Sequence, residues 1–165
     1  MKKILVVALV LVISKFSAQE FFKVGDRVPE IKVNTIKEEP FLLSSLKGKV
    51  VLLDFWASWC APCIEQQPEL KNLYQKLDNQ VKNGKFEIVG FSLDKSKENW
   101  QKIVSRYEIP WVQIGDLKFW KSLVAKNFGV SELPYNILID ENGNVLATNI
   151  HGEELDNFLH QYFNK

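Results

Sequence analysis

Cysteine and histidine are scarce in this chain, with two of each among its 165 residues. That count excludes a framework of several structural disulfides. It also disfavours a zinc finger, which needs four ligands, because only His151 and His160 are available to join Cys60 and Cys63 and their separation matches no finger spacing. Any sulfur chemistry of the protein therefore centres on one cysteine pair.

A large excess of charge of either sign is also absent. The 21 basic residues are nearly balanced by 20 acidic ones, which gives a formal net charge of +1. Proteins that bind nucleic acid through its phosphates need a basic surface, so we expect no nucleic-acid partner. The length, with 25% charged and 46% hydrophobic residues, is typical of one globular domain.

Hydrophobic runs long enough to cross a membrane are missing, since a spanning helix needs about 20 apolar residues. The longest run, Ile4–Ile13, is shorter than that. Lys2 and Lys3 precede it, and small or polar residues follow it before Gln19, which is typical of a secretory signal peptide. We therefore predict a signal peptide over residues 1–18 and one exported domain over residues 19–165. An uncleaved N-terminal membrane anchor and a buried N-terminal strand are the alternatives.

Strand and helix patterns alternate through the middle of the chain. Val50–Trp56 is a nearly continuous apolar run rich in β formers, which predicts a strand buried on both faces. Apolar residues then recur at helical spacing from Ile64 to Val81. A second buried strand is predicted over Phe86–Leu93, with a helix over Lys97–Tyr107 after it. This order favours a β-α-β crossover in an α/β fold.

The two ends of the domain have weaker patterns. Phe21–Pro40 mixes turn formers with short β-rich runs, which predicts an N-terminal hairpin or edge extension. Trp111–Phe128 is interpreted as a loop followed by a helical segment. Tyr135–Ile139 and Asn144–Thr148 flank a turn and predict a hairpin, and an amphipathic helix from Leu155 closes the chain.

The cysteines lie where the predicted buried strand ends and a helix begins, as Cys60-Ala61-Pro62-Cys63. Only a thiolate attacks a disulfide, and a helix N-terminus stabilises that anion through its free N–H groups and dipole. We therefore expect Cys60 to be the more acidic thiol and the nucleophile, and Cys63 to resolve the mixed disulfide. Pro62 suits the first turn because an N–H there has no helical partner. A zinc half-site, a purely structural disulfide and two inert thiols are the competing interpretations.

The segment Asp54–Cys63, with the sequence Asp-Phe-Trp-Ala-Ser-Trp-Cys-Ala-Pro-Cys, resembles the active-site segment of thioredoxin. Much of the remaining chain resembles the exported TlpA/ResA-type branch of the thioredoxin-like superfamily, which is related to the AhpC/TSA proteins. The matching segments are 24–29, 43–50 and 129–140, together with Pro68 after the cysteine motif. The resemblance implies a thioredoxin-like fold, with a central mixed β-sheet flanked by helices and an N-terminal β extension. It also implies the activity of a thiol-disulfide oxidoreductase.

The resemblance assigns roles to residues outside the cysteine motif. Pro134 matches a family proline that follows a cis peptide bond and lies beside the cysteines, so the backbone of Leu133 is expected to pair with a substrate strand. Asp54 matches the buried acid of thioredoxin, which implies that it accepts and returns the proton of the second cysteine. Two positions depart from the family pattern: Tyr135 replaces the usual threonine, and Gln66 replaces a glutamate of exported relatives.

The implied reaction is dithiol-disulfide exchange, in the reducing direction, with protein disulfide or dithiol substrates of the periplasm or cell envelope. It needs no dissociable cofactor and no metal, because the cysteine pair carries the electrons. An upstream membrane or envelope electron donor is expected to regenerate the dithiol, and the enzyme is expected to be a monomer. Substrate contacts are predicted at Trp59, Ala61, Pro62, Leu133 and Pro134.

Two other functions occur on the same fold. A peroxiredoxin-like thiol peroxidase shares the lead-in segment, but this chain lacks a single peroxidatic cysteine with an upstream threonine and proline. A copper-delivery protein places three residues between its cysteines and adds a histidine. Here two residues separate Cys60 from Cys63, and His151 lies past the expected region. Both functions remain alternatives to disulfide exchange.

Overall fold

Strand β3 (Val50–Trp56) lies at the centre of the structure, a computed structural model that describes residues 21–164. All seven of its residues are buried, as its apolar run predicts. β4 (Phe86–Ser92) pairs with it in parallel on one side, and β6 (Tyr135–Ile139) pairs antiparallel on the other. The predicted signal peptide, residues 1–18, lies outside the described residues.

Seven strands form one mixed sheet in the order β2-β1-β5-β4-β3-β6-β7. β7 (Val145–Thr148) is antiparallel to β6, which confirms the predicted hairpin. On the opposite edge, β1 (Lys32–Thr35) and β2 (Pro40–Leu42) form the predicted N-terminal hairpin. β1 joins the sheet by antiparallel pairing with β5 (Val112–Gly115). The mixed sheet with an N-terminal β extension is therefore confirmed.

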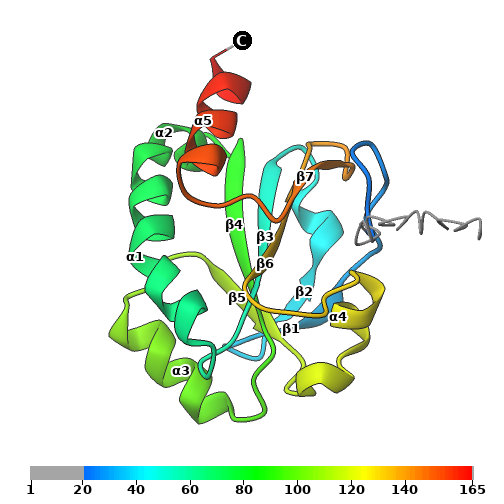
Figure 1. Cartoon of the computed structure of the whole chain (residues 1–165), viewed down its shortest axis with the longest axis vertical. Helices are drawn as coiled ribbons and strands as arrows, with labels where there is room; N and C mark the ends of the chain where they lie inside the picture. Colours follow the sequence, from blue (N-terminus) through cyan, green and yellow to red (C-terminus); the bar gives the residue numbers. More distant parts are fainter. Residues whose placement is uncertain (1–20, 165) are drawn as a thin grey trace, which may run out of the picture.

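Helices cover both faces of this sheet (Figure 1). The crossover from β3 to β4 runs through α1 and α2, which confirms the predicted β-α-β unit. In Figure 1, α1 and α3 lie on one side of the sheet and α4 lies on the other. None of the helices within residues 21–164 has the length and apolar character needed to span a membrane. The helices are α1 (Ala61–Lys76), α2 (Asp78–Lys82), α3 (Lys97–Arg106), α4 (Leu123–Asn127) and α5 (Gly152–Phe163), with 3-10 turns η1 (Leu43–Leu46) and η2 (Phe119–Lys121).

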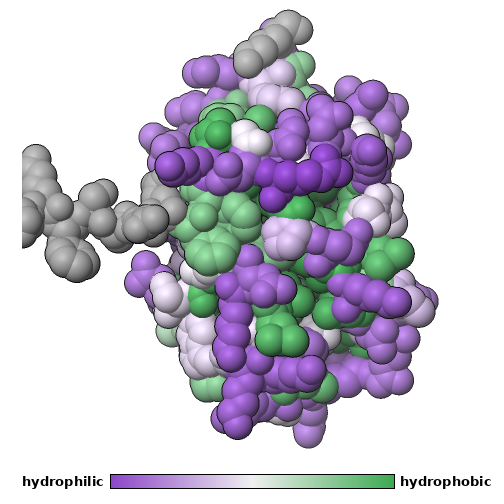
Figure 2. Space-filling model, turned by 90° about the vertical axis from the view of Figure 1, so that its right-hand side faces the viewer, coloured by the Kyte–Doolittle hydropathy of each residue, from purple (hydrophilic) through white to green (hydrophobic). Residues whose placement is uncertain are grey.

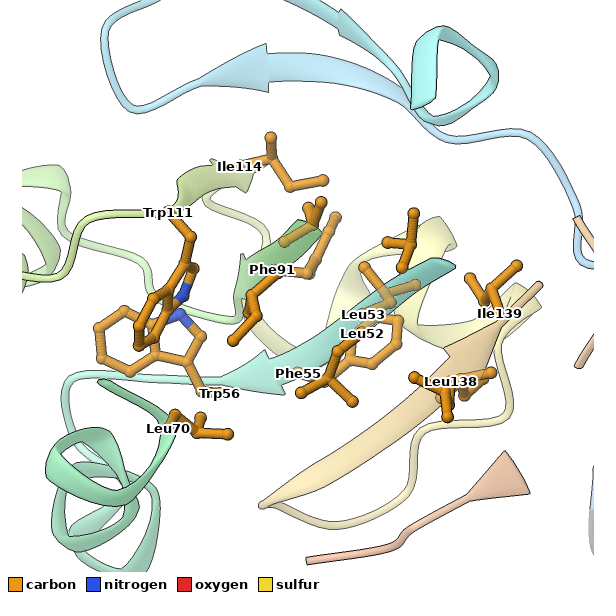
Figure 3. Packing of buried hydrophobic residues seen from close by; sticks show 14 of the residues in the cluster. Leu52, Leu53, Phe55, Trp56, Leu70, Phe91, Trp111, Ile114, Leu138 and Ile139 are labelled. Atoms are coloured by element: carbon orange, nitrogen blue, oxygen red, sulfur yellow. The ribbon is translucent and has the colours of Figure 1, made fainter. Parts of the chain in front are cut away.

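The core is built on the inner strands, and Figure 3 shows their side chains packed between the sheet and the helices. Phe55 of β3 packs against Phe91 of β4 and Phe128 after α4, with ring centroids 5.4 and 5.6 Å apart. Trp56 is fully buried at the end of β3. Burial of each large side chain contributes about 1.5–3 kcal/mol, so this core holds the end of β3, and the chain that follows it, in a fixed position.

One prediction in the middle of the chain was wrong. Residues 112–115 were interpreted as part of a loop, whereas they form β5, which pairs in parallel with β4. The segment alternates Val112 and Ile114 with Gln113 and Gly115, but four residues are too few for this alternation to stand out from the aromatic residues around it. Its pairing with β4 on one side and β1 on the other makes it a strand of the sheet.

The molecular surface is mostly polar. Figure 2 shows one face, on which hydrophilic residues surround separate hydrophobic patches. Single exposed hydrophobic residues are normal for soluble domains, whereas a large apolar side chain beside reactive groups calls for an explanation. Trp59 is such a case, because it precedes Cys60 and is 46% exposed. The other large exposed hydrophobic residues described are Phe21, Val24, Leu42, Leu117 and Leu123.

Candidate active site

Cys60 and Cys63 lie at the N-terminus of α1 and are joined by a disulfide, with their Cα atoms 5.3 Å apart. Cys60 is the N-cap residue, and its Sγ accepts a hydrogen bond from the N–H of Cys63 at 3.3 Å. Pro62 occupies the first helical turn, as predicted, and no acidic residue lies in that turn. The structure therefore places Cys60 where a thiolate is stabilised by backbone N–H groups and by the helix dipole.

The two sulfurs differ in their surroundings. Cys63 belongs to the buried stripe of α1, whereas Cys60 caps the helix between exposed Trp59 and exposed Ala61. Both cysteines are buried as residues, with 5% of Cys60 and 1% of Cys63 exposed. This asymmetry is what an attacking and a resolving cysteine require. Attack by Cys60 and resolution by Cys63 stay predictions.

Asp54 is buried inside β3, with 3% of its surface exposed. Desolvation raises the pKa of its carboxyl to about 7, and a side-chain hydrogen bond with Gln67 opposes part of that increase. The alternative of a solvated charge at the end of the strand is therefore wrong. A carboxyl with a pKa near 7 is suited to accept and return a proton at neutral pH, which is the role predicted for Asp54.

The residues around Asp54 in the sheet are uncharged. Its register partners are Gly90 on β4 and Asn136 on β6. Gly90 is needed because a Cβ there would lie 2.5 Å from Nε2 of Gln113, whose amide fills this space. The amide oxygen of Gln113 accepts a hydrogen bond from Nε1 of Trp56 at 3.0 Å. Asp54 is thus surrounded by neutral groups, which explains why burial dominates its pKa.

The peptide bond between Leu133 and Pro134 is cis, as the family resemblance implies. Pro134 precedes Tyr135, the register partner of Phe55. The bond therefore lies at the end of β3 from which the chain continues to Cys60. Leu133 and Pro134 are half-buried, so their backbone is placed at the rim of the site. Their substrate contacts, like those of Ala61 and Pro62, stay predictions.

An aromatic cluster that the sequence did not reveal lies beside the cysteine motif. The Trp59 ring packs edge-on against Phe119, with centroids 5.1 Å apart, and in a tilted arrangement against Trp120, with centroids 6.0 Å apart. Nζ of Lys95 lies over the Phe119 ring, 4.4 Å from its centroid. Trp111 and Phe128 of the same segment are buried in the core, whereas Phe119 and Trp120 of η2 are half-buried.

Asp94 is a second buried carboxylate near the site, and no motif in the sequence singles it out. It is 2% exposed and accepts hydrogen bonds from the backbone N–H and Oγ of Ser58, at 2.9 and 2.6 Å, and from Oγ of Ser92 at 2.7 Å. Ser58 lies two residues before Cys60. Asp94 therefore anchors the loop between β3 and the cysteines to the end of β4.

We expect Asp94→Asn to lower the free energy of unfolding by about 2 kcal/mol, because an amide cannot accept all three hydrogen bonds and leaves a buried donor unpaired. Urea unfolding of the disulfide-bonded protein at pH 7 measures this loss. Asp116→Asn is the matched control. It also replaces a carboxylate by an amide, but Asp116 accepts one hydrogen bond within its own loop, from the N–H of Lys118. Equal stabilities for the two variants would contradict the anchoring role of Asp94.

Gln67 is the other site residue that the sequence interpretation missed. The buried residues of α1 are Cys63, Gln67, Leu70 and Leu73, spaced along one face of the helix. Nε2 of Gln67 donates a hydrogen bond to the carbonyl oxygen of Cys63 at 3.2 Å. A polar residue within an otherwise apolar helical stripe was the available signal, because buried polar groups need specific partners.

Within residues 21–164, no group of three or more His, Cys, Asp or Glu side chains is arranged to hold a metal ion. Nδ1 of His151 lies 3.2 Å from Nδ2 of Asn136, and its Nε2 lies 2.9 Å from Oδ1 of Asn149. Both ring nitrogens of His151 are therefore engaged by asparagine side chains rather than directed at the cysteines.

Comparison with known proteins agrees with this geometry. A family model described as thioredoxin-like matches residues 48–145. The chain is 31% identical over 155 residues to the thiol-disulfide oxidoreductase ResA of Bacillus cereus, covering 91% of this chain and 82% of that protein. Identity with ResA of Bacillus subtilis is 28% over 149 residues, covering 90% and 79%.

Solved structures show the same relationship. A thiol-disulfide oxidoreductase from Bacteroides fragilis aligns with a TM-score of 0.77 and 33% identity, covering 83% of this chain and 99% of that one. A protein from Chlorobium tepidum, described as a putative thiol:disulfide interchange protein DsbE, aligns with a TM-score of 0.73 and 28% identity, covering 87% and 96%. The chain belongs to the thioredoxin-like family and is a thiol-disulfide oxidoreductase of the ResA/DsbE type, with Cys60 and Cys63 as its cysteine pair.

Proposed function

We propose that this protein is exported and reduces disulfides of other proteins in the periplasm or cell envelope. The observation that carries the proposal is the position of Cys60, whose Sγ caps α1 and accepts the N–H of Cys63 at 3.3 Å while Cys63 is buried one turn further along. A sulfur in this position is favoured as the anion. The reducing direction follows from the resemblance to ResA-type proteins.

The reaction begins with the Cys60 thiolate, which attacks one sulfur of a substrate disulfide. A mixed disulfide forms and the other substrate sulfur leaves as a thiolate, which takes a proton. Cys63 then transfers its proton to the Asp54 carboxylate and attacks Sγ of Cys60, and the departing substrate sulfur takes that proton from Asp54 and leaves as the second thiol. Two electrons and the Cys63 proton have passed from the cysteine pair to the substrate, while the first substrate thiol took its proton from solvent, which had received one when Cys60 ionised. An envelope dithiol donor returns the enzyme disulfide to the dithiol, and no dissociable cofactor takes part.

The substrate is proposed to lie between the cis-proline segment and the aromatic cluster. The backbone of Leu133, before Pro134, is available to pair with an extended substrate segment. On the other side, Trp59 offers an exposed ring supported by Phe119. Ala61 and Pro62 are exposed at the start of α1, directly after Cys60. The small side chain of Ala61 leaves the approach to Cys60 open.

Trapping of substrates tests the proposed function. In Cys63→Ser the resolving sulfur is missing, so the mixed disulfide on Cys60 is expected to accumulate and to be recoverable from envelope extracts under non-reducing conditions. Cys60→Ser, which retains only the buried thiol, is the matched control and is expected to trap little. Equal capture by both variants, or capture by neither, would refute protein disulfide exchange through Cys60.

The direction of the reaction is tested by equilibrating the cysteine pair with glutathione. A reductase is expected to have a potential close to that of thioredoxin, about −270 mV, whereas a potential near −120 mV would identify an oxidant. Peroxide consumption without a thiol substrate would favour the peroxidase alternative. Tight copper binding by the reduced protein would favour the alternative function of a copper-delivery protein.

Export is proposed from the sequence of the N-terminus, where Lys2 and Lys3 precede the apolar run Ile4–Ile13. When the full chain is expressed, we expect the protein to be found in the periplasmic or membrane fraction and to have lost residues 1–18. Mass spectrometry of the purified protein measures the new N-terminus. Recovery of the unshortened chain from the cytoplasmic fraction would contradict export.

We expect Trp59→Ala to reduce kcat/KM for a protein disulfide about tenfold, since one aromatic contact of this kind contributes roughly 1–2 kcal/mol. The rate with a small disulfide, which cannot reach the cluster, should change little. Leu42→Ala removes an equally exposed apolar side chain from β2, at the far edge of the sheet, and serves as the control. Similar losses of kcat/KM with the protein disulfide and with the small disulfide would show that Trp59 affects the reactivity of the cysteines and not the binding of the protein substrate.

A further inference from the structure

The loop after β4 carries a cation to the aromatic cluster of Trp59, Phe119 and Trp120. Nζ of Lys95 lies 4.4 Å from the centroid of the Phe119 ring, which packs edge-on against Trp59 with centroids 5.1 Å apart. Lys95 is exposed, as is 46% of Trp59. An ammonium has three N–H donors, so Lys95 can rest on the ring and still bind an anion from solvent. A cationic group and a large apolar surface therefore lie together next to the cysteine motif.

The same loop holds this surface in place. Nε1 of Trp59 donates to the carbonyl oxygen of Leu93 at 3.4 Å, and the buried carboxylate of Asp94 accepts hydrogen bonds from the loop that precedes the cysteines. Phe119 has a φ of 55°, in the left-handed region, which is rare for an aromatic residue and costs free energy. The strained residue is the one whose ring contacts both the tryptophan and the lysine. Backbone strain of this kind is typical of binding sites.

Two more lysines flank the aromatic cluster, and together with Lys95 they form a cationic rim. Lys118 is the N-cap residue of η2 and Lys121 is its last residue, and both are exposed. None of the three lysines forms an ion pair in the part of the chain that the structure describes. Asp116 is half-buried and accepts the N–H of Lys118, and Glu98, in the first turn of α3, forms no ion pair with the rim. The positive charge of the rim is therefore available to a partner.

We propose that the cationic rim selects the substrates of the cysteine pair, and that the preferred partner is an extended protein segment with acidic side chains near its disulfide and an apolar side chain that packs on Trp59. The inference rests on the proposed function and adds the chemical class of the substrate. An acidic segment that approaches the Cys60 thiolate is repelled unless cations compensate, and the rim supplies them. A basic segment meets like charge there. Glu132, next to Leu133, is exposed, so the preference applies to the part of the substrate that faces Trp59.

Cyclic disulfide peptides that differ only in the residues beside one cysteine, which are glutamate, glutamine or lysine, test this inference. At low ionic strength the reduced protein is expected to reduce the glutamate peptide about tenfold faster than the lysine peptide, because one exposed charge pair contributes up to about fivefold. In Lys95→Met, which keeps an apolar stem and loses the charge, this ratio is expected to fall about threefold. Lys85→Met removes the same charge just before β4, at the opposite end of that strand, and is expected to leave the ratio unchanged.

The salt dependence of the wild type tests the inference without any variant. About 0.5 M NaCl screens charges beyond a few ångströms, so the ratio of the two rates is expected to fall below about twofold. The rate with the glutamine peptide should change little. A ratio that does not depend on salt would overturn the inference, and so would equal losses of the ratio in Lys95→Met and Lys85→Met.

Binding of the same peptides to the oxidised protein separates this inference from the proposed function, because no exchange takes place without a thiolate. The indole N–H signal of Trp59 is followed by NMR and is expected to shift at lower concentrations of the glutamate peptide than of the lysine peptide. Equal dissociation constants for the two peptides would overturn the inference even if the reduced protein reduces both. If the reduced protein reduces none of the peptides, the proposed function is refuted, and the shift of the Trp59 signal still decides whether the rim binds acidic segments.

Discussion

Asp54→Asn is expected to stabilise the oxidised protein at pH 9 by about 4 kcal/mol. The pKa of Asp54 is raised by burial from 3.8 to about 7 in the folded protein, and each pKa unit corresponds to about 1.36 kcal/mol. Between these two values the folded state binds more protons than the unfolded state, so stability falls as pH rises. Above pH 7 the folded protein carries the full cost of a buried carboxylate, which an amide avoids.

Guanidinium unfolding of the wild type and of Asp54→Asn at pH 4, 6, 7.5 and 9 measures this difference. The two proteins should be similar in stability near pH 4, and the gap should open between pH 4 and about 7. His151 contributes an opposite trend, since burial lowers its pKa, but it is present in both proteins and cancels in the comparison. Asp78→Asn, which removes an exposed carboxylate paired with Lys82, should change stability by less than about 1 kcal/mol. A difference in the free energy of unfolding between the two proteins that is the same at all four pH values would contradict the raised pKa of Asp54.

The parts of the fold that were predictable have strong local signals. Val50–Trp56 is predictable as a buried strand because all of its residues except Asp54 are apolar. The cysteine motif marks the start of the next helix because Pro62 fits its first turn. The hairpin of β6 and β7 was predictable from its turn, where Gly143 has a positive φ of 91°. In each case the local preference of the chain agrees with its final environment.

The parts that were not predictable depend on contacts between distant segments. Val112–Gly115 is a strand because β4 and β1 both pair with it, and its four residues are too few to predict a strand on their own. Asp94 becomes a structural group only because Ser58, 36 residues away in sequence, reaches its carboxylate. The rings of Phe119 and Trp59 are in contact although the two residues lie 60 positions apart in sequence. Periodicity describes one segment at a time, so it contains no information about such pairs.

The candidate site shows the same division. Cys60 and Cys63 were identifiable from their spacing and their place at the helix start, and Asp54 and Pro134 from resemblance. Gln67 was missed because a single polar residue in a helix is usually solvated. Its burial follows from its position one turn after Cys63 on the same face of α1. The role of a buried polar residue such as Gln67 is thus recognised only once its hydrogen-bond partners are known.

Asp54 is expected to have its largest kinetic effect on one step, the attack of Cys63 on the mixed disulfide. General base catalysis by a positioned side chain typically contributes 10²- to 10⁴-fold, so Asp54→Asn should slow this step by at least about a hundredfold at pH 7.5. Its amide cannot take the proton of Cys63. The first step needs only the thiolate of Cys60, which is stabilised by the N-terminus of α1, so alkylation of Cys60 should remain close to the wild-type rate.

Stopped-flow mixing of the reduced enzyme with a fluorescent protein disulfide separates the two steps. The wild-type rate of resolution should fall about tenfold for each pH unit below 7, because the fraction of ionised Asp54 falls by that factor. Asp54→Asn should lose this dependence and accumulate the mixed disulfide, as Cys63→Ser does, but with slow release. The register partners of Asp54 are Gly90 and Asn136, and neither side chain can accept a proton in place of the carboxylate. A variant that resolves the intermediate at the wild-type rate would mean that water or the leaving substrate thiolate, and not the carboxyl at residue 54, accepts the proton.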